Sequence, residues 1–408
     1  MLTALLFLLI LSVLVLIHEL GHFLVAKKLG IKVEEFGFGF PPKAFSIKKG
    51  ETEYSINWLP IGGFVKLYGE DEAGAGRLRL PVSSSKYKVS GKKKKILNTQ
   101  YSIPNTDVRR AFYARSAPQK LAVVVAGVIM NAVLAAVIFY VFLFISNFKT
   151  EIPLLGDYTF LGVIQTNKTE LVVSSVSKNS PAQKAGLAPL SKIKKINEIQ
   201  VTDLKQFVAI VNKNKGKEIT IVFEDIKTQK ETREALVPRV NPPKGEGAMG
   251  IGFFGATTAV LDYKTPGQKL LSGIVHPINL MGYNFQILKR LIAVSLQRKT
   301  VAPVSEGVAG PVGIYSLVGT IVQIPDVKER ILGVLNLAGV LSMSLAVFNI
   351  LPIPALDGGR LFFIAIEGIT GKKVNQRIEG FIHQIGMIVL LTLILLITFK
   401  DVSKLFRP

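Results

Sequence analysis

The sequence predicts a polytopic α-helical membrane protein with about four transmembrane helices, a β-hairpin in a basic loop and an inserted α+β domain. Long apolar runs recur along a chain of 408 residues, of which 49% are hydrophobic, as is typical of membrane proteins. Basic residues crowd between the first two runs, where residues 27–120 hold 19 Lys and Arg against 8 Asp and Glu. A soluble-like segment with short β-rich stretches follows the second run.

The first predicted transmembrane helix covers residues 1–26. It is uncharged up to Ile17 and about as long as the roughly 20 residues that cross a bilayer. A secretory signal peptide is the alternative, but the run lacks a basic start and an Ala-x-Ala cleavage site. The same length criterion predicts further transmembrane helices at 121–146, 331–360 and 382–400, with a loop at 361–381.

The basic segment 27–120 is expected to be a cytoplasmic loop, because loops on the cytoplasmic side carry an excess of Lys and Arg. Inside it, residues 73–108 are rich in charge and small polar residues and show no hydrophobic periodicity, which predicts a disordered insert. The net charge of +22 indicates an anionic partner. The apolar runs favour membrane lipids over nucleic acid as that partner.

A β-hairpin is expected in residues 36–70. Apolar residues alternate from Tyr54 through Ile56, the chain turns near Gly62 and Gly63, and an apolar stretch then resumes. An exposed edge of this hairpin could pair with an extended peptide by β-addition. Packing of the same strand against the protein's own helices is the equally weighted alternative.

Residues 151–240 predict a compact α+β domain with β-rich runs and two short helices. One helix has an N-cap signal at Ser180, a proline in its first position and a stop at Gly186. The next segment, 260–330, mixes Leu and Ile with bases and aromatics, so we expect an amphipathic region on the membrane surface.

The chemistry centres on "IHELGH" at residues 17–22, inside the first apolar run. His18 and His22 are four apart, so on a helix they share one face and can bind one metal ion. Glu19 lies beside them and could reach a water molecule at that ion without being a ligand. A buried polar cluster that holds helices together is the alternative, but ionisable groups in spanning helices are usually functional. Because the chain has no cysteine, a metal must be held by His, Asp or Glu.

A catalytic zinc site normally needs a third protein ligand. Asp357 is the favoured candidate, because Pro352 and Pro354 break the third apolar run directly before it and leave polar backbone that must be satisfied inside the protein. Glu34 and Glu35 are alternatives beyond the end of the first helix, and a simple polar helix terminus is the non-functional reading of Asp357. The other two histidines, His276 and His383, are expected to be interfacial and not ligands.

These motifs together resemble the site-2 protease family of intramembrane zinc proteases, in particular its bacterial regulator-of-sigma branch. The resemblance rests on His-Glu-x-x-His in the first helix and "NILPIPALDGG" at 349–359, and it extends over nearly the whole chain. It implies a Zn²⁺ cofactor held by His18, His22 and Asp357, with Glu19 as general base. It also implies that Asn349 positions substrate or stabilises the oxyanion.

The same resemblance concerns the two β-containing regions. "EYSINWLPIGGFVKLYGED" resembles the family's membrane re-entrant β-hairpin, which implies that Tyr54, Ile56, Gly62 and Gly63 position substrate. "SPAQKAGL" resembles the family's PDZ domain, so 151–240 is expected to be PDZ-like. Its carboxylate-binding loop could correspond to Leu155-Gly156 or to Leu161-Gly162.

The expected function is therefore hydrolysis of peptide bonds in transmembrane segments of membrane proteins, with anti-sigma factors or signal-peptide remnants as substrates. The expected location is the bacterial inner membrane, with the PDZ-like domain outside the cytoplasm. A metal transporter or a proteolytically inactive scaffold is the rival interpretation. A transporter would show polar groups on several spans, whereas here they gather near Glu19 and Asp357.

Overall fold

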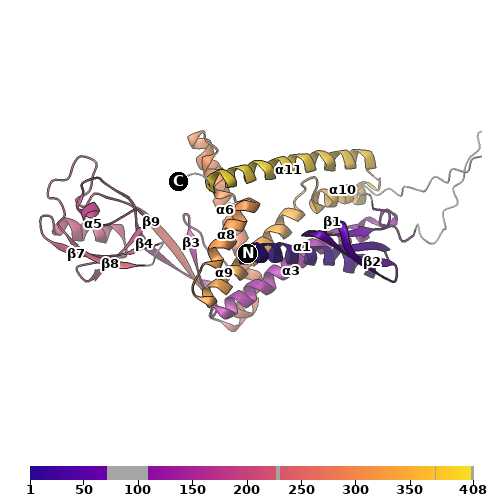
Figure 1. Cartoon of the computed structure of the whole chain (residues 1–408), viewed down its shortest axis with the longest axis horizontal. Helices are drawn as coiled ribbons and strands as arrows, with labels where there is room; N and C mark the ends of the chain where they lie inside the picture. Colours follow the sequence, from indigo (N-terminus) through magenta and orange to yellow (C-terminus); the bar gives the residue numbers. More distant parts are fainter. Residues whose placement is uncertain (71–108, 227–229, 373, 406–408) are drawn as a thin grey trace, which may run out of the picture. The chain divides into compact units, whose positions relative to one another are not determined.

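The computed structural model describes residues 1–70, 109–226, 230–372 and 374–405 (Figure 1). The predicted disordered insert 73–108 falls outside these residues. The chain divides into two compact units. Unit 1 comprises Met1–Phe142 with His276–Pro408, and unit 2 comprises Leu143–Val275.

Four helices in the described residues are long and apolar enough to cross a bilayer, in agreement with the predicted multi-pass membrane protein. They are α1 (Leu2–Lys28), α3 (Ala117–Ile145), α9 (Val327–Ile350) and α11 (Gln376–Leu405). Large apolar side chains such as Leu5, Val133 and Leu395 are exposed on them. In water such surfaces would be unfavourable, so they fit contact with lipid.

The structure differs from the prediction around the third apolar run. α9 ends at Ile350, and a separate helix, α10 (Asp357–Thr370), begins inside the predicted helix 331–360 and continues into the predicted loop 361–381. The two glycines after Asp357 lower the helix propensity there. Packing overrides that preference, because Ile364 of α10 is buried in a cluster with Ala26 of α1 and Val123 of α3.

The region predicted to be amphipathic, 260–330, is mainly helical. It contains α6 (Pro266–Arg298), α7 (Ala302–Gly307) and α8 (Pro311–Val322). α8 packs against α1 through Val318, which is buried with Ile10 and Leu14. A short 3-10 helix, η1 (Phe112–Ala114), precedes α3.

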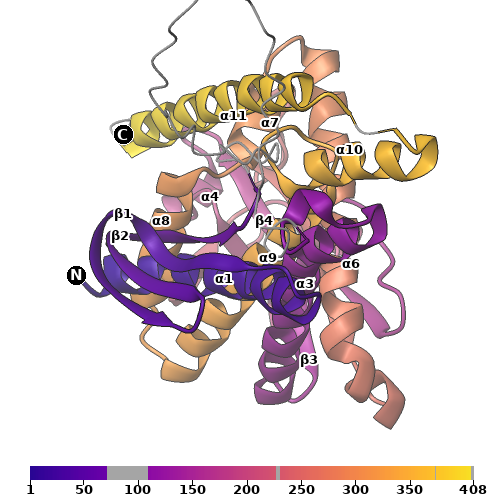
Figure 2. The ribbon, with the colours of Figure 1, turned by 90° about the vertical axis from the view of Figure 1, so that its right-hand side faces the viewer.

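The hairpin region forms a small curled sheet from β1 (Val33–Lys49) and β2 (Thr52–Leu67), which lies along α1 (Figure 2). Residues 43–49 pair with 52–57 across the turn at Gly50, and residues 33–38 pair with 63–67. Residues 35–38 also pair with 53–56. The two arms of the predicted hairpin therefore do not pair with each other, because the start of β1 lies between them.

Unit 2 contains a seven-stranded sheet with two short helices, α4 (Pro181–Lys184) and α5 (Leu204–Lys213). The strand order is β3-β9-β4-β5-β7-β8, and β6 pairs with β5. The strands are β3 (Lys149–Leu154), β4 (Ile164–Val176), β5 (Ser191–Ile196), β6 (Ile199–Gln200), β7 (Ile219–Asp225), β8 (Glu231–Leu236) and β9 (Ile251–Asp262).

The inserted unit extends beyond the predicted end at residue 240. β9 pairs with both β3 and β4, so residues 251–262 belong to the same sheet. The N-cap prediction for α4 is confirmed, since the Ser180 side chain accepts a hydrogen bond from the Gln183 N–H. Leu155-Gly156 and Leu161-Gly162 both lie between β3 and β4. Helix α5 packs on the sheet, where the Phe207 ring lies 4.6 Å from that of Phe253 of β9.

Candidate metal centre

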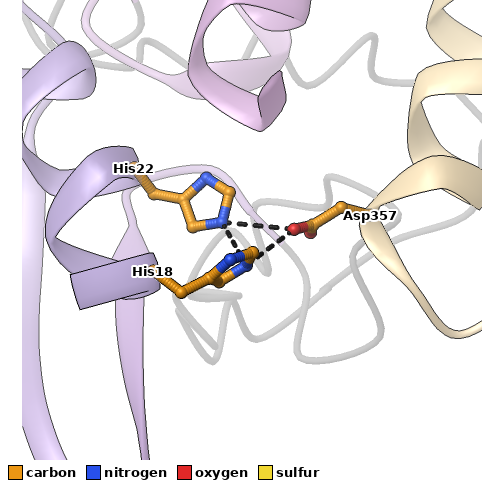
Figure 3. A group of neighbouring side chains, drawn as sticks. All are labelled: His18, His22 and Asp357. Atoms are coloured by element: carbon orange, nitrogen blue, oxygen red, sulfur yellow. Dashed lines mark hydrogen bonds and ion pairs between the residues drawn. The ribbon is translucent and has the colours of Figure 1, made fainter. Parts of the chain in front are cut away.

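The two histidines of the first helix lie on one face of α1 and meet Asp357 from α10 (Figure 3). The Nε2 atoms of His18 and His22 are 3.1 Å apart. Oδ2 of Asp357 lies 2.9 Å from His18 Nε2 and 3.3 Å from His22 Nε2. Asp357 thus meets two histidines that precede it by more than three hundred residues, and all three side chains are nearly buried.

This arrangement fits a metal ion. Two ligand atoms that each bind a tetrahedral zinc ion at about 2 Å lie roughly 3.3 Å apart. The observed separations of 2.9, 3.1 and 3.3 Å agree with that spacing. Two imidazole nitrogens and a carboxylate oxygen are ligands of catalytic zinc, and the same set can bind iron(II). Three protein ligands leave a position open for water or substrate.

The break between α9 and α10 brings Asp357 to the histidines. Ala355 takes a left-handed conformation with φ of 76°, and its N–H donates to Nδ1 of His383 on α11 at 3.0 Å. Gly358 has no room for a side chain, because a Cβ there would collide with the Leu351 carbonyl oxygen. Gly386 of α11 similarly lies against Pro354. The turn that precedes Asp357 is therefore fixed by both neighbouring helices.

His276 and His383, which the sequence predicts to be interfacial, both have side chains buried within the protein. His276 packs between the rings of Phe139 and Phe142, with centroid distances of 5.1 and 6.1 Å. His383 instead accepts the hydrogen bond of the turn before Asp357. Neither belongs to the group of three potential ligands found in the described residues, as predicted.

Glu19 lies on the wall of a cavity of about 160 Å³ next to this group. The volume is enough for a few water molecules. The hairpin region approaches Glu19 closely: a Cβ added to Gly63 would lie 3.5 Å from Glu19 Cγ. The lining residues are Glu19, His22, Phe64, Val65, Leu67, Glu70, Phe112, Val123, Val124, Asp357 and Arg360.

An ion pair that sequence reasoning missed also lines this cavity. Arg360 follows Asp357 by three positions, so both lie on one face of α10. Its guanidinium Nη2 donates to Glu70, just beyond β2. The sequence shows a charged residue directly after "LDGG", but it does not show that this arginine is buried near Asp357. The pair connects the end of the curled sheet to the helix that carries Asp357.

The remaining predicted site residues do not meet at this point. Asn349 lies half-buried in the last turn of α9 and does not line the cavity. Tyr54 packs its ring against Phe23 and Phe36, with centroids 6.1 and 6.3 Å away. Ile56 is exposed. Gly62 has φ of 87°, and a Cβ there would meet the Phe40 ring 2.8 Å away, so a side chain is excluded.

The sequence of the chain matches a known protein family over most of its length. The model described as Peptidase family M50 matches residues 6–393, which is nearly the whole chain. The chain belongs to this family. The resemblance to the site-2 proteases is thereby confirmed.

Two M50 relatives show how far the similarity extends. The zinc metalloprotease RasP of Bacillus licheniformis is 30% identical over 459 residues, which cover 99% of each chain. The regulator of sigma-W protease RasP of Bacillus subtilis is 29% identical over 455 residues, again covering 99% of each chain. A solved PDZ domain of an SdrC-like protein from Listeria monocytogenes matches 24% of this M50 chain and 93% of that domain, at 20% identity and a TM-score of 0.18.

Proposed function

We propose that this M50 chain is a zinc metallopeptidase that hydrolyses peptide bonds within transmembrane segments of membrane proteins. The observation that carries the proposal is the convergence of His18, His22 and Asp357 beside Glu19, on helices suited to a bilayer. The donor set alone also suits iron(II), and the names of the relatives favour zinc. His18, His22 and Asp357 would hold the ion.

Hydrolysis at this site needs water, a base and a polarised carbonyl. When bound, zinc supplies Lewis acidity that polarises water and the scissile carbonyl. Glu19 accepts the proton of the attacking water and later delivers it to the leaving amine. Its place on the cavity wall gives it access to water inside an otherwise apolar bundle. The three ligand side chains are held in place by α1 and by the fixed turn before α10.

The curled sheet supplies a surface on which a substrate strand could be held. In the described residues, 63–67 pairs with β1 on one side only, and Phe64, Val65 and Leu67 line the cavity beside Glu19. An unwound substrate segment can add to such an edge by main-chain hydrogen bonds. The arm with Tyr54 and Ile56 is paired on both sides, so Gly63 is the better placed of the predicted positioning residues.

The distribution of basic residues and the names of the relatives support a membrane topology and a class of substrate for this enzyme. The excess of bases in 27–120 favours a cytoplasmic position for that loop and, after one crossing by α3, an extracytoplasmic position for unit 2. The bacterial inner membrane is the corresponding location. The relative from Bacillus subtilis is named a regulator of sigma-W protease, which favours anti-sigma factors among the possible substrates.

A Glu19→Gln variant tests this function against the rival of a transporter or inactive scaffold. We expect purified wild-type protein to cleave a reporter with one transmembrane segment and to contain zinc by elemental analysis. Glu19→Gln should keep zinc but lose on the order of 10²- to 10⁴-fold in cleavage rate, because the base is removed. Asp357→Ala should lose both zinc and cleavage. Undiminished cleavage by Glu19→Gln would refute the proposed mechanism.

A further inference from the structure

Helix α3 presents three successive turns to the two histidines. The carbonyl oxygen of Val123 lies 2.8 Å from Nδ1 of His22. Four residues later, a Cβ added to Gly127 would lie 2.5 Å from His22 Nε2 and 2.8 Å from His18 Nε2. Another four residues later, the Asn131 carboxamide lies 3.4 Å from Nδ1 of His18. One face of α3 therefore approaches the Nδ1 atom of each ring and the point where the two Nε2 atoms meet.

The chemistry of a ligand histidine determines what each ring needs from α3. A neutral imidazole that binds a metal through Nε2 carries its proton on Nδ1, and that N–H needs a hydrogen-bond acceptor. For His22 the acceptor is the Val123 carbonyl oxygen. For His18 the group within reach of Nδ1 is the Asn131 carboxamide.

The carboxamide has two ends of equal shape, so its orientation follows from its partner. With the nitrogen toward His18, the imidazole Nδ1 would have to be unprotonated and Nε2 would carry the proton, which prevents binding of a metal there. In that orientation the Asn131 oxygen is also buried without a hydrogen-bond partner. Turned round, the oxygen accepts the Nδ1 proton and Nε2 is free to bind.

The burial of Asn131 supports a specific role. Its side chain is in a helix that is otherwise apolar at this level, and the residue is 0% exposed. Polar groups buried in spanning helices are costly and usually functional. The hydroxyl of buried Ser342 on α9 donates to the Asn131 backbone oxygen at 2.8 Å. This bond involves the backbone of Asn131 and leaves its carboxamide free to face His18.

We propose that Asn131 is the positioning residue of His18: its carboxamide oxygen accepts the Nδ1 proton and so directs unprotonated Nε2 to the metal. Together with the Val123 carbonyl, it sets the tautomer of both histidine ligands from a single helix face. The proposal rests on the proposed zinc site. It assigns a function to the "AGVIMN" segment of the second transmembrane helix, which the catalytic motifs do not include.

The test is the zinc dissociation constant of the purified full-length chain, measured by competition with a chelating dye. Asn131→Leu keeps the size of the side chain but removes the acceptor, and we expect zinc to bind on the order of 10- to 100-fold more weakly. Asn131→Asp keeps an acceptor and should bind zinc nearly as tightly as the wild type. The visible spectrum of the cobalt(II)-substituted chain should change in Asn131→Leu and be preserved in Asn131→Asp.

Ser342→Ala is the matched control, because it removes a buried hydrogen bond of the same helix pair without changing the carboxamide. We expect its zinc affinity to equal that of the wild type. Wild-type affinity in Asn131→Leu, or equal losses in Asn131→Leu and Ser342→Ala, would overturn the proposal. A loss in Asn131→Asp as large as in Asn131→Leu would do the same. If Asn131→Leu does not fold, Asn131→Ala takes its place with the same expected sign.

Failure of the zinc site itself would be recognisable. A wild-type chain that binds no zinc refutes the metal centre, and the role of Asn131 falls with it. A wild-type chain that binds zinc tightly while Asn131 substitutions have no effect refutes only the role of Asn131.

Discussion

At the scale of single residues, the ligand nitrogens have room to converge because residue 127 is a glycine. Gly127 lies where the Nε2 atoms of His18 and His22 meet, and any Cβ there would be closer to both atoms than van der Waals contact allows. A Cβ added to Gly21 on α1 would likewise lie only 2.4 Å from the Ala126 carbonyl oxygen of α3. Glycines on both helices thus let α1 and α3 approach until the imidazoles touch the α3 backbone.

A Gly127→Ala substitution should therefore displace the histidines or the ion. We expect the purified variant to contain substoichiometric zinc by elemental analysis and to lose cleavage, because the methyl group occupies the space in which the ligands converge. Gly368→Ala in α10 is the control, since its Cβ would meet Ala117 Cβ at an ordinary 3.6 Å. Full zinc content in Gly127→Ala would contradict the placement of α3 against the histidines.

The residues of the site differ in how visible they are in the sequence. Local spacing on one helix predicts His18, Glu19 and His22, and the proline break predicts the place of Asp357. Asn131 and Gly127 could not be found in this way, because their partners lie more than a hundred residues away on another helix. The available signal was one asparagine in an apolar run. Its role becomes apparent only when the structure shows that α3 lies beside the histidines of α1.

At the scale of elements, the curled sheet is bonded to helix α1 at two places. Ser12 of α1 donates to the Pro60 carbonyl oxygen at 3.0 Å. At the other end, Glu51 in the turn between β1 and β2 accepts hydrogen bonds from both Nη atoms of Arg110, at 2.6 and 2.7 Å, and from Lys27 of α1 at 2.9 Å. These contacts fix the edge 63–67 beside Glu19.

The Glu51 contacts make stability depend on pH. The hydrogen bonds from Arg110, followed by that from Lys27, lower the pKa of Glu51 from the ordinary 4.5 to about 2. Because the folded pKa is below the unfolded one, the stabilisation is fully present above about pH 4.5 and is lost as the pH falls toward 2. Glu51→Gln should lower the melting temperature at pH 6, and its difference from the wild type should shrink at pH 3.

Thermal unfolding of the detergent-solubilised chain measures this difference. Glu34→Gln is a control in the same sheet, where the carboxylate pairs with Lys66 at 3.4 Å and is more exposed than Glu51. A Glu51→Gln difference that stays constant from pH 6 to pH 3 would show that the carboxylate has no special role in holding the sheet.

Elements were predicted well where the signal was long and local. The four apolar helices follow from length and composition, and the α4 cap follows from Ser180 and the proline after it. The pairing of the curled sheet could not be predicted, because alternation gives the faces of a strand and not its neighbours. α10 was missed because its apolar positions matter only against Ala26 and Val123 of other helices.

At the scale of the whole molecule, the chain contains two units that share the helices α3 and α6. Because only α3 separates the basic loop from unit 2 along the sequence, the two should lie on opposite sides of the membrane. Single cysteines at Ser84, outside the described residues, and at exposed Ser175 would test this in a chain without native cysteine. An impermeant thiol reagent should label only the Ser175 variant in intact cells. Equal labelling of both would contradict this topology.

The function of unit 2 can be tested by removing it, because its ends are neighbours in one sheet. Lys149 of β3 and Asp262 of β9 are paired, with Nζ and Oδ2 3.3 Å apart, so a short Gly-Ser linker can replace residues 150–261. The residues of the metal centre all lie in unit 1, and we therefore expect unit 2 to exclude substrates with bulky extracytoplasmic domains and to take no part in the chemistry. Deletion should leave Glu19-dependent cleavage of a short, pre-trimmed substrate largely intact and should increase cleavage of the full-length one. Loss of cleavage of the short substrate in a folded, zinc-loaded deletion variant would instead mean that unit 2 recruits the freshly cut chain end.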